Sequence, residues 1–114
     1  MGPEAFAEWF PHEFGGRLAA IGATLELDAA DGFVVIEGFV VSPPRRRGHG
    51  SSALLMLCAA ADRAGVALAV RPYPIIILVD DPIPLEALES LYARFGFVRD
   101  GAGPMWHRGA TPPA

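Results

Sequence analysis

A loop rich in arginine and glycine is the part of the sequence best suited to bind a ligand. It lies between a strand-like segment and a helix-like segment, and its residues are Arg45, Arg46, Arg47, Gly48, His49, Gly50 and Ser51. The first turn of a helix leaves backbone N–H groups unpaired, and the helix dipole adds partial positive charge there. Glycines let an anion approach such a backbone, and arginines add counter-charge. The loop therefore predicts a phosphate or pyrophosphate site, with an ordinary solvated loop as the alternative.

Two familiar phosphate-binding patterns fit this loop poorly. A Walker-type loop needs a lysine, and all nine basic residues of the chain are arginines. The dinucleotide pattern G-x-G-x-x-G/A is present from Gly48 to Ala53, but prolines and arginines separate it from the strand. Arg71 also stands where the ribose-binding acid is expected. A dinucleotide-binding domain is therefore the weaker alternative.

The elements that position this loop can be predicted from hydrophobic periodicity and from turn residues. We expect one or two short helices in 4–22, paired strands over 24–28 and 33–41, a helix over 52–64, a strand over 66–70, a helix over 85–95, and closing strands over 97–99 and 105–108. Residues 75–79 predict a further edge strand or a buried loop. The succession of strand, helix and strand around the loop predicts two parallel strands, and the whole predicts an α/β fold of the α+β type, with a central mixed sheet flanked by helices.

Composition narrows the class of protein. The chain has 114 residues, 52% of them hydrophobic, which predicts a single domain with a real core. The net charge of −4 argues against a nucleic-acid partner. The single cysteine and the scattered histidines argue against a disulfide and a metal site. Without a leader-like start or an apolar run of about 20 residues, we expect a cytoplasmic protein with no membrane partner. A homodimer is left open.

Two motifs resemble the GNAT superfamily of N-acetyltransferases. Arg45-x-x-Gly48-x-Gly50, after Val-Val-Ser-Pro, resembles the family's acetyl-CoA signature, Gln/Arg-x-x-Gly-x-Gly/Ala between its fourth strand and third helix. Leu91-Tyr92-Ala93-Arg94-Phe95-Gly96-Phe97 resembles its Tyr-x-x-x-Gly-Phe on the last helix. The order and separation of the two motifs also match. The chain looks like a small phage or bacterial member, with one acetyltransferase-like domain over 1–114.

The resemblance divides that domain into three parts. Residues 33–108 form the acetyl-CoA-binding core, residues 1–30 are divergent or shortened, and residues 109–114 are a frayed tail. The resemblance implies that acetyl-CoA is the cosubstrate. The backbone of Phe39, Val40 and Val41 would bind its pantetheine arm, and the segment 46–51 would wrap its pyrophosphate, with Arg45 at the Gln/Arg position of the signature.

The resemblance also implies a general acid, Tyr92, which would protonate the departing thiolate. A phenol can serve as this acid because its pKa of about 10 keeps it protonated near neutral pH. Some members carry a glutamate base in the strand after the loop helix, where this chain has Ala69. Glu37 is the best remaining base, since strand alternation predicts that Glu37, Phe39 and Val41 share one face. The alternatives are an edge-exposed or hairpin-paired carboxylate opposite Glu26 or Asp28, or a water chain in place of a base.

The expected function is acetyl transfer from acetyl-CoA to a primary amine by direct attack. The acceptor would be a small-molecule or peptide amine, and no feature of the sequence identifies it. Two alternatives stay open. The first is a catalytically silent CoA-binding or regulatory module, suggested by Ala69 and the shortened amino terminus. The second is an interaction domain that binds no ligand.

Overall fold

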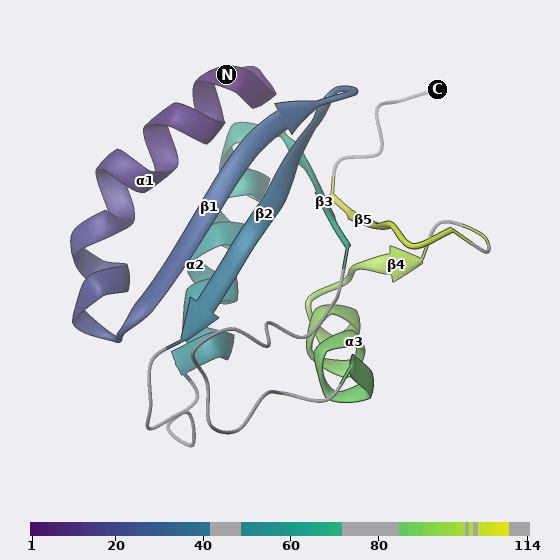
Figure 1. Ribbon diagram of the computed structural model, residues 1–114. Coiled ribbons are helices and arrows are strands. Elements are labelled where there is room, and N and C mark those ends of the chain that lie inside the picture. Colours follow the sequence, from purple (N-terminus) through teal and green to yellow (C-terminus); the bar gives the residue numbers. More distant parts are fainter. Residues whose placement is uncertain (42–48, 72–84, 100, 102, 110–114) are drawn as a thin grey trace.

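The chain forms a five-stranded mixed sheet with its helices arranged around it. The computed structural model describes residues 1–41, 49–71, 85–99, 101 and 103–109. The strand order is β1-β2-β3-β5-β4. Figure 1 shows α1 and α2 on one side of the sheet and α3 beyond the end of β3. Within the described residues, no helix is long and apolar enough to cross a membrane. The predicted mixed α/β fold is confirmed.

The amino-terminal hairpin forms because its turn residues adopt the backbone that a two-residue turn requires. β1 spans Ala23–Ala30, β2 spans Phe33–Val41, and the two strands pair antiparallel. Asp31 and Gly32 connect them with φ of 54° and 82°. Positive φ at both positions matches the twist of the flanking strands. The predicted hairpin is confirmed.

Residues Pro3–Ala20 form one helix, α1, although the sequence left one or two helices open. Pro3 lies in its first turn, where a missing N–H costs nothing. Pro11 lies inside it. Phe6, Phe10 and Leu18 are buried in the core, and this apolar contact holds the helix together despite its weak intrinsic propensity.

The strand–helix–strand unit around the loop has the predicted parallel arrangement. α2 spans His49–Ala64 and β3 spans Ala67–Val70. β3 pairs parallel to β2, from Phe33 opposite Ala67 to Ile36 opposite Val70. Gly65 ends α2 with φ of 69°, and the next amide, that of Val66, donates to the Ala61 carbonyl. The unit places the carboxyl end of β2 before the amino end of α2.

The carboxyl-terminal part closes the sheet. α3 spans Leu85–Arg94, β4 spans Val98–Arg99 and β5 spans Trp106–Arg108. β5 pairs antiparallel with both β3 and β4. Both closing strands were predicted, and both are shorter than expected. The predictions for residues 75–79 and for the tail beyond residue 109 lie outside the described residues.

A β-bulge in the middle of β2 corrects one expectation. Glu26 of β1 lies opposite Gly38, whereas the next residue of β1, Leu27, lies opposite Ile36. Glu37 is therefore the extra residue of the bulge, which reverses the alternation beyond it. Phe39 packs against the core opposite Leu25, while Glu37 is exposed.

The prediction that Glu37 shares a face with Phe39 and Val41 is thus wrong, because it assumed a regular strand. The alternative of an exposed carboxylate agrees with the structure, because Glu37 is exposed. The register does not pair Glu37 with an acid of β1, since Glu26 lies opposite Gly38 and Asp28 lies opposite Val35.

Candidate functional site

The second half of β2 has one edge without a strand partner in the described part of the chain. β3 pairs with residues 33–36 only, whereas β1 pairs along the whole of β2. β3 ends at Val70, opposite Ile36, whereas β2 continues to Val41 (Figure 1). Backbone N–H and C=O groups on such an edge can pair with an extended ligand as they would with a further strand. This edge includes Phe39, Val40 and Val41, the residues expected to bind pantetheine.

The loop after β2 falls mostly outside the described residues. Arg45, Arg46, Arg47 and Gly48 are among those not described. His49 begins α2, and Gly50 and Ser51 lie half-buried in its first turn. The helix starts three residues before the predicted Ser52, so the glycine pattern itself runs into the first turn. The unpaired N–H groups of a sixteen-residue helix therefore lie where the sequence predicts an anion site.

Tyr92 is held inside the core by α3. It is 3% exposed, and its ring meets the Phe97 ring edge-on, with centroids 5.3 Å apart and planes at 70°. The amides of Phe95 and Phe97 both donate to the Tyr92 carbonyl, which ends the helix and brings Phe97 back over it. The residue is therefore part of the core and not of the exposed face of α3. A phenol held this way keeps a single orientation.

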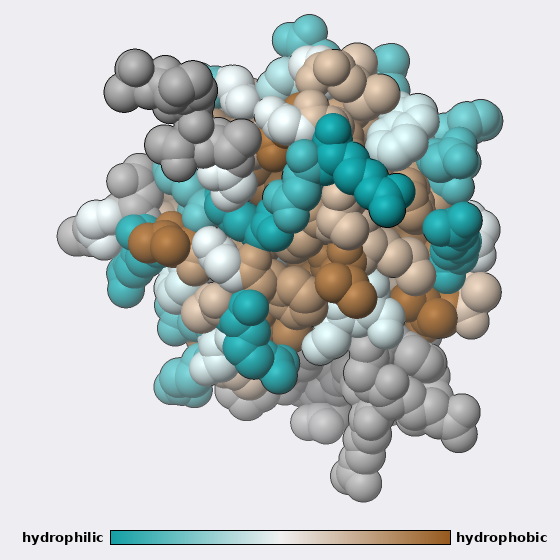
Figure 2. Space-filling view, turned by 180° about the vertical axis from the view of Figure 1, so that it is seen from behind, coloured by the Kyte–Doolittle hydropathy of each residue, from teal (hydrophilic) through white to brown (hydrophobic). Residues whose placement is uncertain are grey.

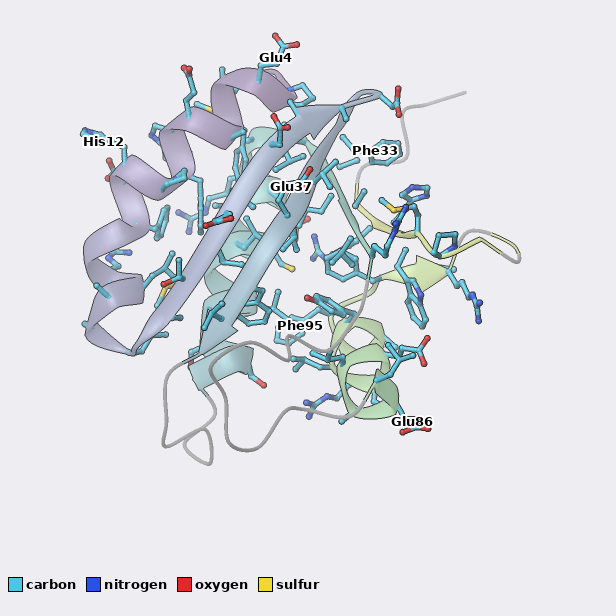
Figure 3. The ribbon with its side chains drawn as sticks, in the orientation of Figure 1. Glu4, His12, Phe33, Glu37, Glu86 and Phe95 are labelled. Carbon is cyan, nitrogen blue, oxygen red and sulfur yellow. The ribbon has the colours of Figure 1, made fainter. Side chains whose placement is uncertain are left out.

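Glu37 lies on the opposite face of the sheet, the face away from α1 and α2. There it lines an open pocket of about 630 Å³ together with Phe33, Val35, Ala69, Arg71 and His107. Figure 3 shows Glu37 in the middle of β2 and Phe33 reaching from its start towards β5. The Phe33 ring stacks on the His107 ring, with centroids 4.4 Å apart. Met105, Ala30 and Asp31 complete the lining.

A second pocket, also of about 630 Å³, lies between α1 and α2. Its lining is mostly apolar and includes Trp9, Phe14, Leu55 and Met56, with Arg17 and Arg63 beside them. The view from behind shows apolar residues near the middle of this face (Figure 2). None of the predicted site residues lines this pocket, so it is separate from the candidate site.

The only cysteine is unsuited to nucleophilic chemistry. Cys58 is 3% exposed on the core side of α2. Burial raises the pKa of its thiol to about 11, which leaves almost no thiolate near neutral pH. The thiol is therefore unsuited to act as a covalent nucleophile. Among the described residues, no group of three or more His, Cys, Asp or Glu side chains could hold a metal ion.

Arg108 on β5 forms hydrogen bonds to α2 and to the segment that follows α3. The Arg108 guanidinium donates to both carboxylate oxygens of Asp62 on α2, at 2.9 and 3.1 Å, and to the Phe95 carbonyl after α3. The hydrogen bond from Arg108 lowers the pKa of the Asp62 carboxyl. This fork links α2, β5 and the end of the helix that carries Tyr92, so it supports the position of the candidate acid.

Sequence reasoning missed two residues of the open pocket, Arg71 and His107. Arg71 entered only as a mismatch to a dinucleotide pattern, and His107 only as a poor metal ligand. A signal for Arg71 was present, because it follows directly on the strand predicted to run parallel to 33–41. The position of His107 in this pocket could not be predicted, because local sequence patterns do not show that its short strand pairs with β3.

Comparisons with known proteins agree with this architecture. No protein-family model matches the sequence, and no curated protein matches it. Among solved structures, the crystal structure of the anti-CRISPR protein AcrVA5 is similar, with a TM-score of 0.61 and 24% sequence identity. The alignment covers 77% of this chain and 90% of that one. The likeness shows a shared mixed α/β fold.

Proposed function

We propose that the chain is a GNAT-like N-acetyltransferase of the cytoplasm that transfers an acetyl group from acetyl-CoA to a primary amine. The observation that carries the proposal is the open edge of β2 after its bulge, leading towards the first turn of α2. An extended ligand arm can pair with the open edge of β2, and a pyrophosphate can bind at the first turn of α2. The motif that resembles the acetyl-CoA signature ends in this same first turn.

The binding role divides between backbone and side chains. The backbone of Phe39, Val40 and Val41 would hold the pantetheine arm, and the amides of segment 46–51 would hold the pyrophosphate, with Arg45, Arg46 and Arg47 as counter-charge. Acetyl-CoA supplies the activated acetyl group. A bulge takes backbone groups out of the ladder, so an N–H near Glu37 and Gly38 is a suitable donor for the developing oxyanion.

Proton transfers complete the proposed reaction. The acceptor ammonium gives one proton to the Glu37 carboxylate, and the free amine then attacks the thioester carbon. The C–N bond forms and the C–S bond breaks, and the thiolate takes the Tyr92 hydroxyl proton. The second proton of the nitrogen restores the Tyr92 hydroxyl, and Glu37 then releases the first proton to solvent. Buried Tyr92 is suited to this role by its single orientation, and exposed Glu37 by its access to the acceptor.

A silent CoA-binding module is the second candidate, and Ala69 favours it. This residue lies beside His107 of β5 and lines the open pocket, so a position on β3 that faces this pocket lacks an acid. In that case coenzyme A would bind, but no amine would be acetylated.

Two assays on the full chain separate these functions. Isothermal titration with acetyl-CoA and with CoA should show binding at micromolar to low millimolar concentration. A free-thiol assay over a panel of amines should then show release of CoA that depends on the amine. Binding without release on any amine would identify the silent module. A folded protein without binding at millimolar CoA would exclude both functions.

A further inference from the structure

The open pocket exists because small residues of β3 lie beneath larger ones from its neighbours. Phe33 is in register with Ala67, and His107 is in register with Ala69. Aligned residues of paired strands point to the same face, so the Phe33 and His107 rings flank the methyl groups of β3. The two rings stack across this strand at an angle of 13°. The result is a wall of fixed shape along one side of a cavity large enough for a small metabolite.

Opposite charges face this cavity from β2 and from the residue that directly follows β3. Ile36 is in register with Val70, so the residues that follow them, Glu37 and Arg71, come at the same level of the sheet. Both are exposed, both line the pocket, and the two side chains form no ion pair with each other. They stand where β2 and β3 cease to pair. Neighbouring strands are about 5 Å apart, so one small molecule can reach both side chains.

We propose that this pocket binds the acceptor of the reaction and that the acceptor is a free α-amino acid; this inference rests on the proposed function. The ammonium group would meet Glu37, and the adjacent carboxylate would meet the Arg71 guanidinium, which binds carboxylates through two parallel hydrogen bonds. The side chain would lie along the apolar surface of Phe33, Val35 and Met105.

The charge pattern discriminates between classes of amine. In a polyamine, a second ammonium that approached Arg71 would be repelled. The other acid of the lining, Asp31, precedes the start of β2 and is separated along the strand from Glu37. A simple amine without a carboxylate would leave Arg71 without a counter-charge in the complex. An α-amino acid satisfies both side chains at once. The transfer follows the proton balance given above, with Glu37 taking the first ammonium proton and the product being an N-acetyl amino acid, CoA thiol and one released proton.

The test compares leucine with 3-methylbutylamine, which differs from it only by the missing carboxylate. In the free-thiol assay we expect the wild-type protein to prefer leucine at least tenfold in kcat/KM. Arg71→Gln should raise the KM for leucine at least tenfold and leave that for 3-methylbutylamine within twofold. Arg63→Gln, which removes an arginine from α2 outside this pocket, is the matched control and should keep the preference.

A binding measurement makes the result independent of turnover. Leucine should shift the NMR signals of the His107 and Phe33 rings at millimolar concentration, and Arg71→Gln should remove the shift. Transfer to 3-methylbutylamine or a polyamine as fast as to leucine, with no effect of Arg71→Gln, would overturn the amino-acid proposal while the proposed function stands. If CoA does not bind, the proposed function fails, and the leucine titration alone decides what the pocket accepts. No shift at tens of millimolar leucine would overturn the proposal.

Discussion

The two halves of β2 have the same neighbour on one edge and different surroundings on the other. Residues 33–36 pair with β1 and with β3, and their inward side chains, Val34 and Ile36, are 0% and 6% exposed. Residues 37–41 follow a bulge, pair with β1 alone among the described strands, and include exposed Glu37 and Val40. The comparison shows how one strand can both anchor a core and offer a binding edge.

The largest expected effect is on CoA binding, from a substitution in the first turn of α2, which follows residues 37–41 of β2. Gly50→Glu places a carboxylate in the first turn of α2, where the proposed site holds a pyrophosphate. Repulsion should weaken CoA binding at least a hundredfold in isothermal titration. The fold should survive, because an acidic residue is compatible with a helix amino terminus.

Gly16→Glu on α1 is the control for this substitution, since nothing lies within 4 Å of the position of its Cβ. It should bind CoA as the wild type does. Equal binding by both variants would remove the first turn of α2 from the site.

A pair of matched truncations tests whether residues 33–36 of β2 contribute more to the stability of the core than residues 37–41 do. Val34→Ala removes buried methyl groups and leaves a cavity, so we expect a loss of about 2–3 kcal/mol in the free energy of unfolding. Val40→Ala, on the same strand but 41% exposed, should cost about 0.5 kcal/mol or less. Urea denaturation measures both values. Similar losses would mean that the two halves contribute alike to the core.

Tyr92→Phe tests the chemistry assigned to the buried tyrosine of α3. The substitution keeps the ring and its contact with Phe97 but removes the proton donor. We expect turnover in the free-thiol assay to fall at least tenfold, with acetyl-CoA affinity changed less than threefold. Unchanged turnover would take Tyr92 out of the mechanism.

The smallest expected effect is on stability, from loss of the hydrogen bonds by which Arg108 connects β5 to α2 and to the end of α3. Asp62→Asn removes the carboxylate that binds Arg108, and because that side chain is 58% exposed we expect a loss of about 1 kcal/mol or less at pH 7. The folded state lowers the Asp62 pKa, so this stability is present above the ordinary carboxyl pKa of about 3.9. It disappears as the pH falls through the lowered value.

Urea denaturation of the wild type and of Asp62→Asn at a series of acidic pH values measures this difference. Glu8→Gln, at an exposed position of α1, is the control and should show no such trend. A difference that grows as the pH falls would contradict the assignment.

Local sequence patterns were enough to predict most of the fold. The Asp31-Gly32 turn predicted the hairpin, and the apolar spacing before Gly65 predicted α2 and the parallel pair. The face of Glu37 could not be predicted, because a bulge depends on how two strands fit together and not on alternation within one. Arg71 and His107 joined the candidate site for the same reason: the pairing of β3 with β2 and β5 brings their pocket together.

Hydrogen exchange tests the central claim most directly. The claim is that the edge of β2 beyond the bulge receives an extended ligand. On addition of saturating CoA, the amides of residues 37–41 that face this edge should exchange at least tenfold more slowly, while those of 33–36 keep their rates. Unchanged rates over 37–41, or equal slowing over both halves, would contradict the account.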